Sequence, residues 1–418
     1  MSILEILSTG QKIKRARIYK GITLKELCKD KISISKMSCI ENGKVKADED
    51  TIRYIADIIQ VDYDYLMQDI YEQIFNNLKT IKAGNAIGRE LEDNININLG
   101  YAIEYEYYDL ALELIHILFT YYLNIDDESK CNNIISKYYS VYEKSNCDEA
   151  TITYYLDIAK FLSKKGEYFE AIVYYSRLRE LNILKSAEKG VKNKVILNEA
   201  KCYLNIEEFD KCYNLLRELI VDEDNSDYSE IYQYYALVCI ILGYKDADIY
   251  IKKFFDSVQD NPMNLAYGKE KFSEAYFKIG NEDLAIKEIK EAVELFPIDK
   301  EVELVEYNNR IIELLFKNEK YDYAHELVEK NLNTAISCNN IKLIEKSYYL
   351  KGMILNKKGK INEAEMYLNL SLDSLYKFGS KKERCDRYLD MAHLYYKLNN
   401  NRDAIKYFNL SMEIEKDL

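Results

Sequence analysis

Residues that interrupt helices are scarce in this sequence. Among its 418 residues there are 2 Pro, 14 Gly and no Trp. Proline removes a backbone N–H and clashes within a helix, and glycine weakens a helix by about 1 kcal/mol relative to alanine. Since both are rare while 48% of the residues are hydrophobic, the composition predicts an all-α protein with ample core. The length allows two to four domains or one long repeat array.

Catalytic and metal-binding patterns are missing too. The three His are His116, His325 and His393, and the nine Cys include no CxxC pair. None of the His has a motif-spaced nucleophile or metal-ligand partner, and no Walker loop, GxGxxG or HExxH sequence occurs. We therefore expect no enzyme activity, no metal and no cofactor.

Long apolar runs are also absent. The longest, Ala236–Leu242, is far shorter than the roughly 20 residues that a membrane-spanning helix needs. No signal peptide opens the chain, and unpaired Cys are typical of a reducing compartment. Together these features predict a cytoplasmic protein without a membrane partner.

Positive charge is in short supply overall but is concentrated in one segment. The net charge is −13, yet Lys12–Lys46 holds eleven Lys or Arg and three acidic residues, a charge of +8. A compact basic segment on an acidic chain is typical of a nucleic-acid-binding domain.

The basic segment carries clear helix signals. Thr23 and Glu26 make a capping box, Ser33 is a second N-cap, and Gly21 and Gly43 are C-terminal stops. Inward-facing apolar residues recur at helical spacing: Ile13, Ala16, Leu24, Leu27, Cys28, Met37, Ile40, Ile52, Ile55, Ala56 and Ile59. Residues 1–68 are therefore predicted to form a small helical domain.

This pattern resembles the XRE-type helix-turn-helix over residues 8–66. The matching residues are Ile13–Arg17, Gly21-Ile22-Thr23-Leu24, Leu27-Cys28, Ser35, Met37-Ser38, Ile40-Glu41 and Gly43. The resemblance implies that Arg17 pairs with Glu41 and that the helix after Ser33 enters the major groove of DNA. One departure is the turn, where Lys31-Ile32 stands in place of the usual glycine.

Exposed residues of this helix and its flanks are the candidate DNA contacts. The base-facing candidates are Ile34, Ser35, Ser38 and Cys39. The phosphate-facing candidates are Lys36, Lys44, Lys46 and the backbone near Asn42, and Thr23 and Ser33 complete the DNA-binding set. No base-facing residue is Arg, Gln or Asn, so DNA shape and half-site spacing should share the recognition. The alternative is an inert helical bundle with a solvated charged face.

Residues 69–90 are predicted to form a helical linker, and residues 91–418 contain a recurring turn. Each copy is a short polar turn that ends at a small residue, and the copies begin at Glu106, Gly166, Glu207, Gly243, Gly280, Glu319, Gly359 and Asn399. The copies recur every 35–41 residues after Ala171, and a gap of 60 residues before it leaves room for an added helix. The motif resembles the tetratricopeptide repeat, which implies a right-handed α-solenoid.

A solenoid of this kind presents a groove lined by the first helix of each pair, and such grooves bind extended peptides. The groove-facing candidates are Lys201, Gln233, Glu270, Glu274, Asn309, Glu313, Tyr349, Asn356 and His393. The two Asn could hydrogen-bond a peptide backbone. At each position the alternative is an ordinary solvated surface.

An XRE-type head on a degenerate tetratricopeptide array resembles the RRNPP group of peptide-responsive regulators, which includes Rap, Rgg, NprR, PlcR and PrgX. The resemblance implies a cytoplasmic homodimer that binds promoter DNA and is switched by a short signalling peptide in quorum sensing. A two-fold dimer would recognise a palindromic operator. One alternative is a Rap-like protein whose array holds a response regulator or kinase, with DNA binding secondary. A narrower variant is a phage lysis–lysogeny regulator.

Overall fold

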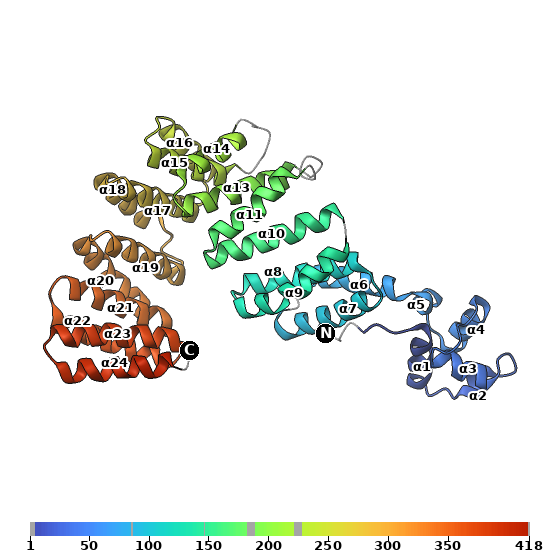
Figure 1. The fold of residues 1–418 in the computed structure, drawn as a ribbon. Coiled ribbons are helices and arrows are strands. Elements are labelled where there is room, and N and C mark those ends of the chain that lie inside the picture. Colours follow the sequence, from blue (N-terminus) through green and yellow to red (C-terminus); the bar gives the residue numbers. More distant parts are fainter. Residues whose placement is uncertain (1–4, 85–86, 146, 182–188, 221–227, 417–418) are drawn as a thin grey trace. The chain divides into compact units, whose positions relative to one another are not determined.

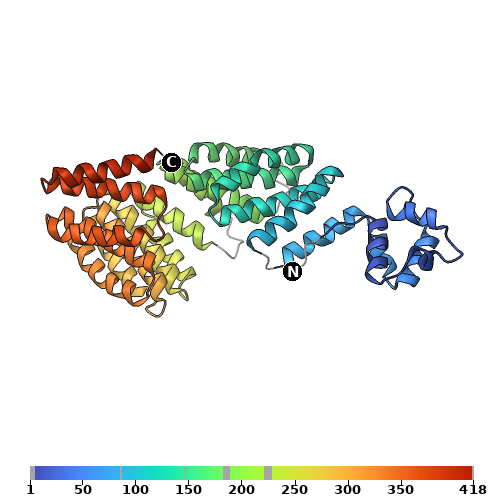
Figure 2. The ribbon, with the colours of Figure 1, turned by 90° about the horizontal axis from the view of Figure 1, so that it is seen from below.

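The computed structural model describes residues 5–84, 87–145, 147–181, 189–220 and 228–416. Within these residues every regular element is a helix, which confirms the all-α prediction. The chain folds into two compact units, Met1–Ile206 and Glu207–Leu418, shown in Figures 1 and 2. The predicted division at 1–68, 69–90 and 91–418 stays a prediction. No helix in the described part is both long and apolar enough to span a membrane.

The first unit begins with a bundle of five short helices, called the head below. Its helices are α1 (Thr9–Tyr19), α2 (Leu24–Cys28), α3 (Ile34–Glu41), α4 (Glu49–Ile59) and α5 (Tyr63–Met67). Apolar residues from all five helices, among them Ile13, Leu27, Met37, Ile55 and Leu66, form one buried core. The capping box at Thr23 and Glu26 is present, and a second one joins Ser8 and Gln11 at the start of α1.

Helices α1 and α3 approach each other so closely that a side chain at Gly10 would not fit. A Cβ atom at Gly10 would lie 2.1 Å from the backbone oxygen of Ile40. Since backbone cannot retreat as a flexible side chain can, glycine is required here. The contact brings α1 against the end of α3.

The head is fastened to α6 (Ile70–Ala83) by buried polar groups. The Gln73 side-chain amide accepts from the Leu7 N–H at 3.0 Å and donates to the Leu7 carbonyl at 2.9 Å. The buried Lys12 ammonium donates to the carbonyls of Tyr65 and Gln68 at 2.7 and 2.8 Å. Burial lowers the pKa of Lys12 to about 8. Figure 2 shows α6 leading away from the head.

The rest of the first unit consists of antiparallel helices packed in sequence order. They are α7 (Gly88–Glu104), α8 (Tyr108–Asn124), α9 (Glu128–Ser145), α10 (Asp148–Lys165), α11 (Tyr168–Glu180) and α13 (Lys189–Asn205). One core runs from α6 to α10, and Ile6 from the segment before α1 is part of it. Helix α9 occupies the 60-residue gap in the repeat pattern.

The second unit continues the helix pairs. Its helices are α14 (Phe209–Ile220), α15 (Ser229–Leu242), α16 (Ala247–Ser257), α17 (Pro262–Lys278), α18 (Glu282–Leu295), α19 (Glu301–Lys317), α20 (Tyr321–Ser337), α21 (Ile341–Lys357), α22 (Ile361–Leu375), α23 (Lys381–Lys397) and α24 (Asn401–Glu415). Contacts across helix pairs join them: for example, the buried Tyr307 hydroxyl donates to the Ala266 carbonyl at 2.9 Å.

The recurring turn has one conformation throughout the array. The residue that begins each of its eight copies has a positive φ, between 55° and 81°. In four copies that residue is Gly, which adopts this region without strain, and in the others it is Glu106, Glu207, Glu319 or Asn399. The small residue that ends the turn is buried in seven copies and half-buried at Ala247 in the weakest. The motif therefore combines a left-handed helix stop with a close helix contact.

Because Glu319 holds this left-handed conformation (φ 60°), which costs a residue with a Cβ roughly 1–2 kcal/mol, we predict that Glu319→Gly stabilises the protein by up to about 1 kcal/mol. The greater freedom of glycine in the unfolded chain offsets the rest of the gain. Gly280→Ala (φ 74°) should destabilise it by a similar or larger amount. Urea unfolding followed by circular dichroism measures both changes. Glu319→Ala is the control, since it removes the carboxylate but keeps the strained Cβ. An equal gain in Glu319→Ala would mean that the side chain's charge, and not the backbone, costs stability.

Candidate nucleic-acid interface and candidate peptide groove

The N-terminal half of α3 is presented to solvent. The Ser33 hydroxyl caps the helix by accepting from the Lys36 N–H at 3.2 Å. Met37 and Ile40 turn into the core, while Ile34, Ser35 and Lys36 are exposed and Ser38 and Cys39 are half-buried. All of the predicted base-facing residues are thus accessible on one short helix whose first N–H groups point outward.

The end of α3 places the phosphate-facing candidates. The Asn42 side chain donates to the Ser38 carbonyl at 2.8 Å, and Gly43 reverses the chain with φ 69°. The Lys44 N–H then donates a hydrogen bond to the Cys39 carbonyl at 2.8 Å. Lys44 and Lys46 therefore extend from a fixed turn, and both are exposed. The Asn42 amide is used in capping the helix.

Not all basic residues of the segment 12–46 reach the protein surface. Of the eleven Lys and Arg between 12 and 46, Lys12 is buried at the α6 joint and Arg17 is held inside the head, while the other nine are exposed. Thr23, the remaining DNA-binding candidate, is exposed at the start of α2. The Lys36 ammonium lies 3.6 Å from the exposed Asp48 carboxylate, a distance at which a surface pair contributes little.

Arg17 and Glu41 form the pair that the resemblance implies. The Arg17 Nε and Nη2 atoms donate to the two Glu41 carboxylate oxygens at 2.6 and 3.0 Å, and Nη1 donates to the Ile22 carbonyl at 2.9 Å. Their side chains are only 13% and 4% exposed. The hydrogen bonds to Glu41 raise the pKa of Arg17. The pair fixes α3 against α1 and the loop before α2.

The turn between α2 and α3 contains a strained residue that sequence inspection did not identify. Lys29 has φ 43° and ψ −132°, a combination that residues with a Cβ rarely adopt. Lys31 and Ile32 stand where the helix-turn-helix pattern usually has a glycine. Ile32 is buried in the head core, and the Lys31 N–H donates to the Cys28 carbonyl at 3.1 Å. The role of the missing glycine is therefore taken by Lys29.

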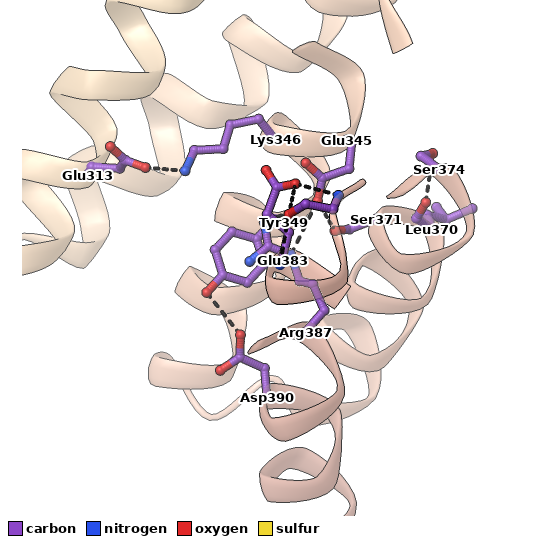
Figure 3. Close-up of polar contacts among 11 residues, drawn as sticks. Glu313, Glu345, Lys346, Tyr349, Leu370, Ser371, Ser374, Glu383, Arg387 and Asp390 are labelled. Atoms are coloured by element: carbon purple, nitrogen blue, oxygen red, sulfur yellow. Dashed lines mark hydrogen bonds and ion pairs between the residues drawn. The ribbon is translucent and has the colours of Figure 1, made fainter. Parts of the chain in front are cut away.

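In the second unit, polar side chains connect the first helices of neighbouring pairs. Arg310 on α19 donates to Glu270 on α17 at 2.9 Å. Lys346 on α21 pairs with Glu313 on α19. The Tyr349 hydroxyl on α21 donates to Asp390 on α23 at 3.0 Å. We call Glu313, Lys346, Tyr349, Arg387 and Asp390 the α19–α23 cluster (Figure 3).

Arg387 organises the C-terminal side of this cluster. Its guanidinium carbon lies 3.1 Å from the centroid of the Tyr349 ring, and its Nε and Nη2 donate to the buried Glu345 at 3.2 and 3.1 Å. Ser371 also donates to Glu345 at 2.7 Å. Burial raises the pKa of Asp390, although Tyr349 and Arg387 oppose the shift. A planar cation on an aromatic ring beside a half-buried acid can contact both the carbonyls and the N–H groups of a peptide.

The predicted groove residues have different surroundings. Glu313 and Tyr349 belong to the α19–α23 cluster, and His393 is exposed one turn beyond Asp390 on α23. The Asn356 side chain accepts from Lys397 at 3.1 Å, and Glu274 pairs with Lys271 on its own helix. Gln233 is half-buried on α15.

Three candidates are less suited to a peptide. Asn309 is 5% exposed, and its side-chain oxygen accepts from the buried Asn331 at 2.9 Å. That prediction is corrected: Asn309 joins α19 to α20 inside the fold. Glu270 is buried beneath Arg310, and burial raises its pKa. Lys201 lies on α13 in the first unit, apart from the second-unit set.

Sequence inspection missed Arg310, Lys346, Arg387 and Asp390. Arg310 is the immediate neighbour of Asn309, so the predicted helix face was off by one residue at that point. Arg310 follows Glu270 by 40 residues and Asp390 follows Tyr349 by 41, close to the repeat period. A donor and an acidic residue one repeat period apart were therefore the signal that could have found these pairs.

Comparison with known proteins identifies the repeat type. Residues 345–374 and 386–418 match the family model of the tetratricopeptide repeat, which confirms that part of the prediction. The sequence matches none of the curated proteins with which it was compared.

Several solved structures are similar to this chain at low sequence identity. The apo form of the quorum sensor NprR from B. thuringiensis has a TM-score of 0.44 and 15% identity, over 83% of this chain and 100% of that one. Bacillus thuringiensis PlcR in complex with the peptide PapR7 and DNA has a TM-score of 0.30 and 14% identity, over 88% of this chain and 94% of that one. Aspartyl phosphate phosphatase F from Bacillus subtilis has a TM-score of 0.41 and 15% identity, over 99% of this chain and 95% of that one.

We predict that Arg17→Ala lowers the free energy of unfolding of the head by about 3–5 kcal/mol, because it leaves the Glu41 carboxylate buried without a partner. Amide hydrogen exchange of residues 10–41 measures the loss locally. Arg15→Ala is the matched control, since Arg15 pairs with Glu5 at an exposed site and should change stability by less than about 1 kcal/mol. Equal protection in Arg17→Ala and wild type would show that the pair does not stabilise α3.

Proposed function

We propose that this protein is a cytoplasmic transcriptional regulator that binds promoter DNA through α3 as a homodimer. A short signalling peptide bound by the tetratricopeptide array switches its activity. The observation that carries the proposal is the exposed N-terminal half of α3, which carries Lys36 and is followed by the exposed Lys44 and Lys46. The Arg17–Glu41 pair fixes this helix on its inner side. The proposed protein has no enzyme activity.

The surface of α3 suits a DNA-binding protein that recognises its site partly through the shape of the DNA. Ile34, 49% exposed at the first helical position, offers an apolar contact for a thymine methyl group, and Ser35 can donate to or accept from either base pair. The exposed Lys side chains supply sequence-independent attraction to phosphates. Affinity should therefore depend strongly on salt, with moderate discrimination between bases.

The α19–α23 cluster is the proposed centre of the peptide site. It combines an aromatic ring, cations, the half-buried Asp390 and the exposed Glu313 on the first helices of three successive pairs. Such a surface suits a short peptide with both polar backbone contacts and an apolar side chain. A peptide that binds one arrangement of the array better than another would shift the arrangement of the heads.

We predict that Lys44→Ala weakens binding to all DNA sequences and makes the salt dependence shallower by about one unit in the slope of log K against log salt. Fluorescence anisotropy with DNA from the gene's own upstream region gives the slope. Lys20→Ala is the control, because its ammonium contacts the Gln60 carbonyl at the end of α4. A wild-type slope in Lys44→Ala would remove this residue from the interface, and wild-type protein that binds random DNA equally well would refute the operator-binding function.

The proposed dimer surface is a stripe on α24. Ile405, Phe408 and Met412 follow one another at helical spacing and are 61%, 50% and 40% exposed, while Ala404 and Ser411 are buried on another side of the helix. Three exposed apolar side chains on one face are typical of an interface. A second copy of the stripe would cover them in a two-fold arrangement.

We predict that Phe408→Glu converts the dimer to a monomer of 49.3 kDa, measured by analytical ultracentrifugation. Lys406→Glu also introduces a carboxylate, at an exposed position about 100° or more around α24 from Ile405, Phe408 and Met412, and should leave the dimer intact. A dimer that persists in Phe408→Glu would place the interface elsewhere. A monomeric wild type would contradict the homodimer itself.

A further inference from the structure

Four aromatic side chains, on α6 and in the turn between α7 and α8, lie in a continuous row. The Phe75 and Tyr71 rings stack with their centroids 6.4 Å apart. The Tyr107 ring meets Tyr71 edge-on at 5.1 Å and stacks with Tyr105 at 6.1 Å. Phe75 and Tyr105, the two ends, are 40% and 44% exposed, and the inner two rings are half-buried. We call these four residues the aromatic row.

Only the inner two rings of the row pack on the hydrophobic core. Tyr71 and Tyr107 contact the core that runs from α6 to α10, and the Tyr71 hydroxyl donates to Asp109 at 2.7 Å. Within the described part of the chain, Phe75 and Tyr105 do not belong to that core. Contiguous aromatic surface that the fold leaves exposed is typical of an interaction site.

The Phe75 end of the row holds a cation from its own helix. The Lys79 ammonium lies 4.1 Å from the centroid of the Phe75 ring, one helical turn further along α6. Lys79 has no carboxylate partner among the described residues. This contact shows that the surface accommodates a cation on an aromatic face.

The Tyr105 end has carboxylates but no cation. Glu104 and Glu106 are the chain neighbours of Tyr105, and both are exposed. Neither these two residues nor Asp109 forms an ion pair within the described residues, and no Lys or Arg lies over the Tyr105 ring there. An aromatic ring beside uncompensated carboxylates attracts a cation, because the ring quadrupole and the negative charges act together.

Among the cations of proteins, the guanidinium of arginine fits this arrangement best. It is planar, so it stacks on a ring, and the N–H groups at its edge donate to a carboxylate. A single guanidinium on Tyr105 would leave the aromatic surface at Phe75 exposed. A protein segment with an apolar residue beside the arginine would cover both ends, and such interfaces are rich in aromatic residues and arginine.

We propose that the aromatic row docks an extended, arginine-containing segment of a partner protein. The arginine stacks on Tyr105 and pairs with a neighbouring carboxylate, while its apolar neighbour covers the Phe75 end. The row lies in the first unit, whereas the α19–α23 cluster and the α24 stripe lie in the second. The proposal therefore does not depend on the peptide site, the dimer surface or DNA binding.

The test uses full-length protein and the fluorescein-labelled peptide Gly-Leu-Arg-Gly-Leu-Arg-Gly in anisotropy titrations at constant ionic strength. A second peptide carries citrulline, the neutral analogue of arginine, at both arginine positions. We expect saturable binding of the arginine peptide and much weaker binding of the citrulline peptide. Equal affinity for the two peptides, or no saturable binding of the arginine peptide, would overturn the proposal.

Tyr105→Ala should raise the Kd of the arginine peptide by about 2- to 5-fold, the effect of one exposed cation–π contact, and Tyr105→Phe, which keeps the ring, should not change it. Glu104→Gln should also raise the Kd. The matched controls are Tyr396→Ala, 71% exposed on α23, and Glu143→Gln, exposed on α9, which should keep the wild-type Kd. A wild-type Kd in both Tyr105→Ala and Glu104→Gln, or an equal loss in Glu143→Gln, would show that the peptide does not bind at this row.

Discussion

The close approach of neighbouring helices is the constraint on which the array depends. Each repeat turn stops one helix with a left-handed residue and begins the next with a small side chain, which is buried in every copy but the weakest, as at Ala171, Ala285 and Ala364. The first feature reverses the chain within a few residues, and the second lets the two helix axes approach. Since a repeat packs mainly on its neighbours, this local geometry, used many times, builds the array from contacts between successive helix pairs.

In the head, close packing of α1 against α3 depends on a glycine and an ion pair. Gly10 allows α1 to touch the backbone of α3, and the bidentate Arg17–Glu41 pair then fixes the angle between them. A buried ion pair is weak evidence for net stability, but removal of one partner is costly because it leaves an uncompensated buried charge. The outcome is a short helix that is rigid on its inner side and exposed on its outer side, as a DNA-reading element needs.

Local signals in the sequence predicted most of this fold. Capping boxes, glycine stops and the repeat turn gave the helix ends and the array, since these depend on a few adjacent residues. The predicted groove failed where a side chain's environment depends on its neighbours. Asn309 and Arg310 both lie on α19, but only contact with Asn331 on α20 places the amide inside. The strained backbone of Lys29 and the burial of Lys12 could not be predicted from the sequence either, because both depend on tertiary contacts.

The joint between head and array constrains how a peptide could act. Ile6 packs into the array core with Ile74, and Gln73 binds both backbone groups of Leu7, so the segment before α1 forms part of the α6 surface. Lys12 holds α1 to the carbonyls of Tyr65 and Gln68, directly before α6. Because the segment before α1 and the end of α5 are both held at this joint, the head should move with α6 as one body, and α1 passes that movement to α3 through Gly10 and Arg17. For the proposed regulator, the difference between the peptide-bound and peptide-free states therefore belongs in the packing of array helices, where a ligand can favour one arrangement over another.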